Sequence, residues 1–135
     1  MTMSRIRPTR AHLAASGITS LLFAMLVAPM AARAAGPAWK VIGGDARRAP
    51  ALMQGYGCTA CHTIPGLANA EGNVGPPLIR FADRTYIAGM LRNTPSNLVR
   101  WIRDPQGVIP GNAMPNMGVP EAQARDIAAY LYTLR

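Results

Sequence analysis

The stretch Cys58-Thr59-Ala60-Cys61-His62 decides the fold of this 135-residue chain. Cys-x-x-Cys-His is the spacing at which a c-type haem is attached. Two thiols three positions apart can each add to one haem vinyl group, and the residue that follows can present its imidazole to the iron. The motif therefore predicts one covalent haem c, attached through Cys58 and Cys61, with His62 as an axial ligand of the iron.

Three other uses of the motif fit the sequence less well. A thioredoxin-like Cys-x-x-Cys belongs to a βαβ unit, and nothing like a strand precedes Cys58. A structural zinc site needs four ligands, whereas the chain has two cysteines and two histidines, and His12 lies in a segment that we expect to be removed. A disulfide between Cys58 and Cys61 would leave His62 without a role.

The first 34 residues have the pattern of a secretory signal peptide. A basic start (Arg5, Arg7 and Arg10) precedes an uncharged, mostly apolar stretch over residues 13–27 and a small-x-small cleavage pattern at residues 32–34. Haem attachment in bacteria takes place outside the cytoplasmic membrane, so export agrees with the haem motif. We therefore expect the mature protein in the periplasm.

One alternative to cleavage remains open. Residues 13–32 form an uncharged stretch of 20 residues, which is long enough to span a bilayer. Polar and glycine residues dilute this stretch, so the sequence favours cleavage. Association with the membrane is expected if the segment is retained.

The net charge of +8 overstates the charge of the mature domain. Four of the 14 basic residues lie in the first 34 residues, so ten basic and six acidic residues remain, a net charge of +4. Few aromatic residues and no run of lysine or arginine accompany this charge, which argues against nucleic acid as a partner. A modest positive charge could instead guide docking to an acidic redox protein.

Residues 46–135 are expected to form one small domain behind a flexible lead-in over residues 35–45. About 100 residues make a single domain, and a core of that size is marginal without further apolar volume. A bound porphyrin would supply that volume, so the haem-free chain should be poorly folded. Apolar residues at helical spacing, without clear period-two alternation, predict an all-α domain of three to five helices around one haem.

Proline, glycine and N-cap residues place the helices within this domain. The expected helices are residues 46–56 with Asp45 as N-cap, residues 84–91, residues 95–103 with Thr94 as N-cap, and a last helix that Pro120 opens. Pro50 interrupts the first of these, which therefore either starts near Ala49 or is kinked. Residues 63–80 and 105–119 are rich in glycine, proline and asparagine and are expected to be loops.

Four methionines are candidates for the second axial ligand: Met53, Met90, Met114 and Met117. Met53 and Met90 fall on expected helices, where methionine usually packs in the core. Met114 lies in a loop that flanking prolines stiffen, and such a loop can hold a weak thioether donor against iron. Met114 is therefore the favoured ligand and Met117 the runner-up. An iron with both axial positions filled argues against oxygen activation and peroxide turnover.

Residues 49–135 resemble the class I cytochromes c. The resemblance follows the order of an N-terminal helix, the haem motif, Gly75-Pro76, a Pro-Gly-x-x-Met loop and a last helix with Ala129-Tyr130-Leu131. Residues 93–106 (NTPSNLVRWIRDPQ), together with residues 114–116, are similar to the cytochrome c domain fused to subunit II of some bacterial haem–copper oxidases. No copper-binding pattern precedes the domain here, so a free shuttle and an oxidase subunit both stay open.

The resemblance implies roles for four further residues. In the family, the carbonyl that matches Pro76 accepts the imidazole N–H of the haem histidine, and the arginine that matches Arg84 faces a haem propionate. Trp101 matches an aromatic hydrogen-bond donor on the methionine side of the haem, with the Met114 sulfur or a propionate as its acceptor. Tyr130 matches an aromatic that packs the last helix across the first.

These observations predict a periplasmic one-electron carrier that is not itself an enzyme and that delivers electrons to a terminal oxidase. The alternative is the haem c subunit of a periplasmic dehydrogenase complex, in which the same domain would serve. Both interpretations expect redox proteins as partners. The sequence contains no acid–base pair, nucleophile setting or phosphate loop that would support a catalytic reaction.

Overall fold

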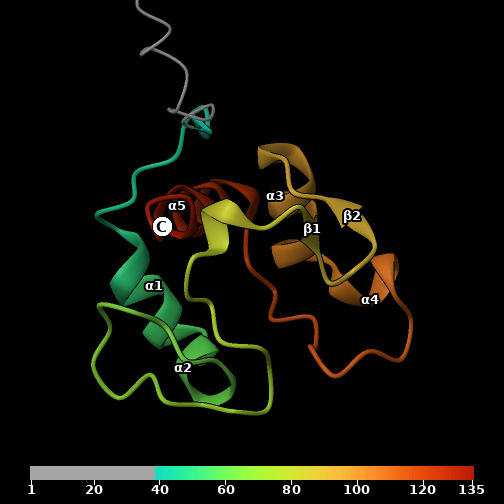
Figure 1. Ribbon diagram of the computed structural model, residues 1–135, viewed down its shortest axis with the longest axis horizontal. Helices are drawn as coiled ribbons and strands as arrows, with labels where there is room; N and C mark the ends of the chain where they lie inside the picture. Colours follow the sequence, from blue (N-terminus) through green and yellow to red (C-terminus); the bar gives the residue numbers. More distant parts are fainter. Residues whose placement is uncertain (1–38) are drawn as a thin grey trace, which may run out of the picture. The chain divides into compact units, whose positions relative to one another are not determined.

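The computed structural model describes residues 39–135, and the structural statements below concern these residues alone (Figure 1). The expected signal peptide over residues 1–34 and the first part of the expected lead-in lie outside the described residues. The elements are α1 (Ala49–Gly55), α2 (Cys58–Cys61), the 3-10 helix η1 (Phe81–Asp83), β1 (Tyr86–Ile87), β2 (Leu91–Arg92), α3 (Pro95–Arg103), α4 (Pro105–Val108) and α5 (Glu121–Leu131). The domain is helical apart from one short hairpin, which agrees with the all-α prediction.

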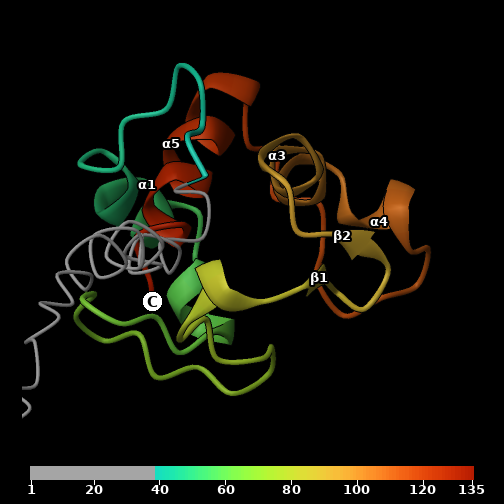
Figure 2. The same ribbon diagram turned by 45° about the horizontal axis from the view of Figure 1, so that its top comes forward.

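Helix α5 is the centre of the frame, because both α1 and α3 pack against it. Figures 1 and 2 show α5 between these two helices. Its buried face carries an apolar stripe with the 3.6-residue period of an amphipathic helix: Ala124, Ile127, Ala128 and Leu131. The short helices and the hairpin extend from this frame and position the loops of the site.

Helix α1 starts later than residue 46. Pro50 occupies one of the first two helical positions, where a missing N–H costs no hydrogen bond, so the helix begins at Ala49. The N-cap residue is Arg48, and the prediction of Asp45 was wrong. Asp45 Oδ1 instead accepts a hydrogen bond from the backbone N–H of Arg47 at 3.0 Å, in a turn ahead of the helix.

The last part of the expected flexible lead-in is packed against the domain. Val41 is 8% exposed and belongs to the core. Gly44 lies so close to α5 that a Cβ there would be 2.4 Å from the carbonyl oxygen of Arg125. The backbone N–H of Asp45 donates to Asp126 Oδ1 at 2.7 Å. The packed chain therefore begins before residue 46.

The prediction of a helix over residues 84–91 is wrong. Residues 86–92 instead form a hairpin, in which Ile87 of β1 pairs with Leu91 of β2. Ala88 and Gly89, two of the three residues between the strands, have φ angles of +49° and +71°, which a right-handed helix cannot contain but which suit the tight turn closed by the Met90 N–H donating to Ile87 O at 3.0 Å. Met90, expected in a helix core, lies in this hairpin and is 66% exposed.

Buried Asn93 fixes the base of the hairpin. Its side-chain N–H groups donate to the carbonyls of Phe81 at 3.0 Å and Arg84 at 2.9 Å. Its Oδ1 accepts the hydroxyl of Tyr132 at 2.8 Å. One amide thus joins η1, the hairpin and the end of the chain, and it replaces the helical hydrogen bonds that the segment lacks.

Helix α3 begins and ends where the sequence predicts. The Thr94 hydroxyl accepts the N–H of Asn97 at 3.3 Å, and the helix stops before Asp104. The expected loop over residues 105–119 differs at its start, because Pro105–Val108 forms α4. Asp104 Oδ1 accepts the N–H of Gly107 at 2.8 Å and so caps this new helix, while Pro105 both stops α3 and starts α4.

Candidate haem site

The haem motif lies on a single helical turn. Gly57 has a φ of +70° between α1 and α2, so the chain changes direction there. Cys58 and Cys61 are three residues apart on α2 and therefore share one face. Both are free thiols of intermediate exposure. Burial raises the pKa of the Cys58 thiol.

His62 follows α2 in an extended conformation, and a backbone carbonyl orients its ring. Nδ1 lies 2.8 Å from the carbonyl oxygen of Pro76. A carbonyl can only accept, so Nδ1 carries the proton and Nε2 keeps its lone pair for a metal. The structure thus contains the Pro76 contact that the family resemblance implies.

Gly75 leaves space for the imidazole. A Cβ at this position would lie 2.2 Å from Cε1 of His62, so the backbone passes the ring more closely than any other residue type would allow. The N–H of Gly75 donates to the carbonyl of Cys61 at 2.8 Å. This hydrogen bond fixes the loop segment that crosses the haem motif. Sequence analysis named Gly75 only as part of a family pattern and missed this packing role.

Residues 63–80 form the compact loop that their composition predicts. The N–H of Leu78 donates to the carbonyl of Thr63 at 2.8 Å, and the Thr63 hydroxyl donates to Gly72 O at 3.1 Å. The Tyr130 hydroxyl donates to Pro65 O at 2.6 Å. Tyr130 therefore ties α5 to this loop, a contact that sequence analysis did not predict.

Arg84 lies against the same loop. Its guanidinium donates to the carbonyl of Pro77 and, at 3.4 Å, to that of Ile79. Its Cζ lies 5.2 Å from the centre of the Phe81 ring. Partial burial lowers the pKa of Arg84. Arg84 therefore lies against the same loop that carries the Pro76 carbonyl.

The exposures of the candidate methionines differ. Met53 is 1% exposed and packs in the core, as predicted, whereas Met90 points outward from the hairpin. Met117 is 37% exposed. Met114 has intermediate exposure, and hydrogen bonds hold its backbone on both sides: its N–H donates to Asn112 Oδ1 at 2.8 Å and its carbonyl accepts Gln106 Nε2 at 2.7 Å.

The loops on the two sides of the site remain separate in their hydrogen bonding. Within residues 39–135, no hydrogen bond joins the Met114 loop to the loop that contains Pro76. Trp101, on α3, is partly buried against the core, and its indole N–H, which is not itself a buried group, makes no hydrogen bond to another described residue. A group bound between these loops would therefore complete contacts that the chain does not make by itself.

The donor set fits a covalent haem and no simple metal ion. No group of three or more His, Cys, Asp or Glu residues that could hold a metal ion occurs in the described part of the chain. Two free thiols on one helical face, followed by an imidazole with Nε2 available, match the two thioethers and one axial ligand of a haem c.

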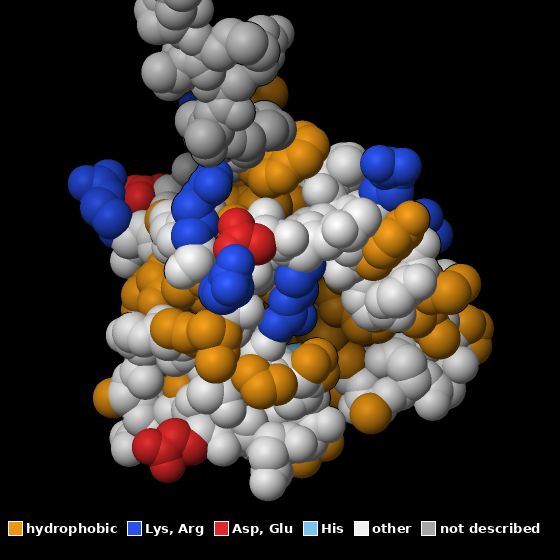
Figure 3. Space-filling model, viewed as in Figure 1, with side chains coloured by type: hydrophobic (Ala, Val, Ile, Leu, Met, Phe, Trp, Pro, Cys, Tyr) orange, Lys and Arg blue, Asp and Glu red, His pale blue; other side chains and the backbone are white. Residues whose placement is uncertain are grey.

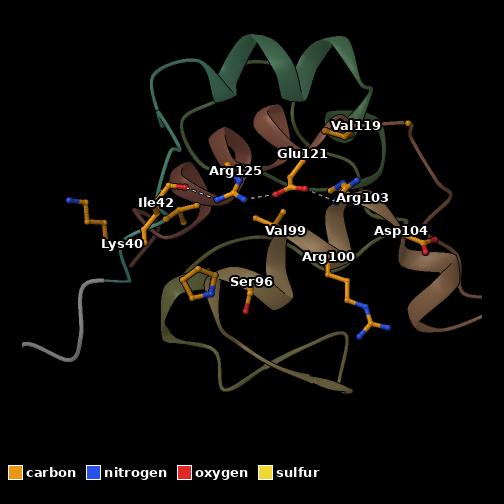
Figure 4. Close-up of a pocket in the computed structure, with 13 residues that line it drawn as sticks. Lys40, Ile42, Ser96, Val99, Arg100, Arg103, Asp104, Val119, Glu121 and Arg125 are labelled. Atoms are coloured by element: carbon orange, nitrogen blue, oxygen red, sulfur yellow. Dashed lines mark hydrogen bonds and ion pairs between the residues drawn. The ribbon is translucent and has the colours of Figure 1, made fainter.

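A separate cavity of about 930 Å³ contains none of these residues. It lies between the segment near Val41, α3 and α5 (Figure 4). Glu121 forms ion pairs there with Arg103 at 3.1 Å and with Arg125. Figure 3 shows Lys and Arg side chains beside acidic and apolar ones on the face seen in Figure 1. This cavity is a charged surface feature rather than the haem site.

A small helical domain with such a motif defines a single-haem protein of the c type. The chain belongs to the cytochrome c family, since the family model described as "Cytochrome c" matches residues 46–135. Haem c, covalently bound, is therefore its cofactor, and the domain is an electron carrier. This agrees with the family resemblance and the cofactor that the sequence predicted.

Two kinds of relative are similar to the chain. Cytochrome c oxidase subunit 2 of Alkalihalophilus pseudofirmus is 40% identical over 78 residues, which cover 58% of this chain and 21% of the relative. Subunit 2 of Bacillus sp. strain PS3 is 37% identical over 82 residues, covering 58% and 23%. Cytochrome c2 iso-2 of Magnetospirillum fulvum is 33% identical over 88 residues, covering 57% of this chain and 91% of the relative.

The chain thus spans about a fifth of the length of the oxidase subunits that it matches. No solved structure matches the chain. Among residues 39–135, none of the helices has the length and apolar character that crossing a membrane requires.

Proposed function

We propose that this cytochrome c is a periplasmic one-electron carrier that delivers electrons to a terminal oxidase. When bound, haem c exchanges one electron between ferric and ferrous iron. The residues of the chain attach it, orient its ligands and shield it. The observation that carries the proposal is the His62–Pro76 contact beside the two free thiols, because it leaves Nε2 free as a ligand.

In this proposal His62 and Met114 are the axial ligands, and Cys58 and Cys61 form the thioethers. The Pro76 carbonyl holds the imidazole in one tautomer and increases its basicity. A methionine ligand favours the reduced iron and raises the potential. The partly buried setting of Met114 and the two hydrogen bonds on its backbone support it over the more exposed Met117.

Arg84 and Trp101 are proposed to line the haem. Arg84 already donates to two carbonyls of the loop that carries Pro76, so a propionate would meet a cation held in place. The free indole N–H of Trp101 would serve a propionate or the Met114 sulfur. In this role neither side chain exchanges a proton. Arg84 compensates the charge of a propionate, and Trp101 orients its acceptor through a hydrogen bond.

The oxidase as electron acceptor is inferred from similarity. Three matched relatives are named as subunit 2 of cytochrome c oxidase, and two of these, at 40% and 37% identity, exceed the 33% and 35% of two matched cytochromes c2. Export of residues 35–135 after cleavage of the signal, or retention of residues 13–32 as an anchor, would place the domain on the side of the membrane where such a subunit accepts electrons.

Mixing the reduced holoprotein with oxidase-containing membranes tests the acceptor. Rapid reoxidation that cyanide blocks supports the proposal. The absence of reoxidation at every ionic strength contradicts it, and co-purification with a large dehydrogenase that reduces the haem would favour the alternative of a dehydrogenase subunit.

Replacing Met114 with Ala tests the ligand. In the ferric protein the methionine–iron charge-transfer band should disappear, and carbon monoxide should bind the ferrous protein readily. Retention of the band would move the ligand to Met117, and the Met117→Ala variant, expected to keep the band, is the matched control.

A further inference from the structure

The side chain of Gln106 makes all its hydrogen bonds to one short part of the methionine loop. Its Nε2 donates to the carbonyls of Asn112 at 2.9 Å and Met114 at 2.7 Å. Its Oε1 accepts the N–H of Gly111 at 3.0 Å. A glutamine amide has two donor hydrogens, so both are used on this loop.

Apart from Gln106, the loop is held mainly by the side chains of Asn112 and Asn116; Asn112 Nδ2 donates to the carbonyls of Pro105 at 2.9 Å and Ile109 at 2.6 Å. In the described chain, residues 110–118 take part in one backbone–backbone hydrogen bond, from Asn112 to Ile109 at 3.3 Å. None of these residues is buried. In a segment without buried residues and with little backbone pairing, side-chain hydrogen bonds determine where the chain lies. The hydrogen bonds of Gln106 and Asn112 both reach the backbone of Met114.

Gln106 is itself firmly placed. It follows Pro105, whose side chain is less than 2% exposed, on the capped helix α4. Its backbone N–H donates to Asn116 Oδ1 at 3.2 Å, and Asn116 Nδ2 donates to Asp104 Oδ1 at 3.2 Å. The amide of Gln106 therefore connects the core to the backbone of Met114.

We propose that Gln106 is a positioning residue for the axial methionine. By holding the chain at Gly111, Asn112 and Met114, it keeps the thioether directed at the iron and lowers the fraction of protein in which the sulfur has moved away. External ligands bind iron only in that fraction. This inference rests on the proposed ligation by Met114.

Gln106→Ala in the holoprotein tests the inference. Loss of hydrogen bonds with a net value of about 1.4 kcal/mol should raise the affinity of the ferrous protein for carbon monoxide about tenfold. The reduction potential should fall, because methionine favours the reduced iron. If Gln106→Ala folds poorly, Gln106→Glu replaces it, since glutamate keeps an acceptor for Gly111 but sets a carboxylate against two carbonyls.

Gln123→Ala is the matched control. Gln123 is also a partly buried amide that joins two elements, because its Oε1 accepts the hydroxyl of Tyr56 between α5 and α1. Its loss should lower the stability of the protein and leave carbon monoxide affinity and potential unchanged.

Three outcomes overturn the inference. One is a Gln106 variant with wild-type carbon monoxide affinity and potential, while Met114→Ala loses its charge-transfer band; this leaves the proposed function intact. Another is an equal change in Gln123→Ala, which would show general destabilisation. The last is retention of the band in Met114→Ala, which removes the proposed ligand and the inference together.

Discussion

At the scale of single residues, the orientation of His62 depends on two backbone neighbours rather than on side chains. The Pro76 carbonyl accepts its Nδ1 proton at 2.8 Å, and Gly75 leaves the space that the ring occupies. The first contact selects the tautomer and the second permits the position. An imidazole held in this way needs no carboxylate partner to keep Nε2 available.

Gly75→Ala should destabilise the holoprotein by about 2 kcal/mol, in the range for overpacking at a tight site. The new Cβ would lie 2.2 Å from His62 Cε1, so either the ring or the loop must move. Guanidinium denaturation followed in the haem absorption band measures the loss.

Gly55→Ala is the control for this change. Gly55 is the last residue of α1, and a Cβ there would meet nothing within 4 Å. Helix propensity predicts unchanged or higher stability, by up to about 1 kcal/mol. Equal destabilisation by both substitutions would contradict the proposed role of Gly75.

Part of the candidate site could be predicted residue by residue. The spacing of Cys58, Cys61 and His62 was sufficient to predict the haem attachment site, because covalent attachment requires this spacing. The hydrogen bonds of Gln106 could not be predicted from the sequence, because they depend on where α4 places the side-chain amide relative to a loop with no regular structure. Its only signal in the sequence is its position directly after Asp104-Pro105.

At the scale of elements, predictions succeeded where one residue type imposes a boundary. Thr94 followed by proline starts α3, and Pro105 stops it, because capping and the missing N–H act locally. The prediction failed over residues 84–91. Ala88-Gly89 is not the Asn-Gly pair that marks a tight hairpin, and the buried amide of Asn93 that fixes its base is a tertiary contact.

Ala88→Asn should stabilise the protein by about 0.5 to 1 kcal/mol. Asn tolerates the φ of +49° at this position better than Ala does. In a helix the same substitution would lower stability, because Asn has the weaker helix propensity. The sign of the change in the free energy of unfolding therefore separates the hairpin from the helix, and a decrease would contradict the hairpin.

Asp126 joins α5 to the start of α1. Its carboxylate is 4% exposed and accepts Arg48 Nε at 2.7 Å and the backbone N–H of Asp45 at 2.7 Å. The hydrogen bond from Arg48 lowers the pKa of Asp126 below its ordinary value of 3.8. Since the folded pKa is the lower one, this stabilisation is present above pH 3.8 and is lost as the pH falls through the folded value.

Asp126→Asn should therefore lower the free energy of unfolding by about 2 kcal/mol at neutral pH, the range for charge-assisted hydrogen bonds. The same substitution should make the stability below pH 4 less dependent on pH. Asp45 contributes a separate part of the acid dependence, because Arg47 lowers its pKa to about 2. Urea denaturation at a series of pH values measures both effects.

Asp83→Asn removes an exposed ion pair with Arg80 on η1 and should change stability by less than about 0.5 kcal/mol. An acid dependence of Asp126→Asn identical to that of the wild type would contradict the role of Asp126.

At the scale of the whole molecule, the domain is small, and no residue of its methionine loop over 110–118 is buried. A Cys58→Ala, Cys61→Ala double variant, which cannot attach haem, should lack a cooperative thermal transition, because the chain alone buries a marginal core. Circular dichroism measures this, and a sharp transition near that of the holoprotein would contradict it.

The path of the chain after His62 has a consequence for the order of assembly. Gly75 and Pro76 reach back onto Cys61 and His62, so the loop that covers the motif can close only when the chain as far as Pro76 is free to fold. Until then Cys58 and Cys61 lie on a segment that this loop does not cover. The contacts that orient His62 are thus completed by residues that follow it in the chain by 13 and 14 positions.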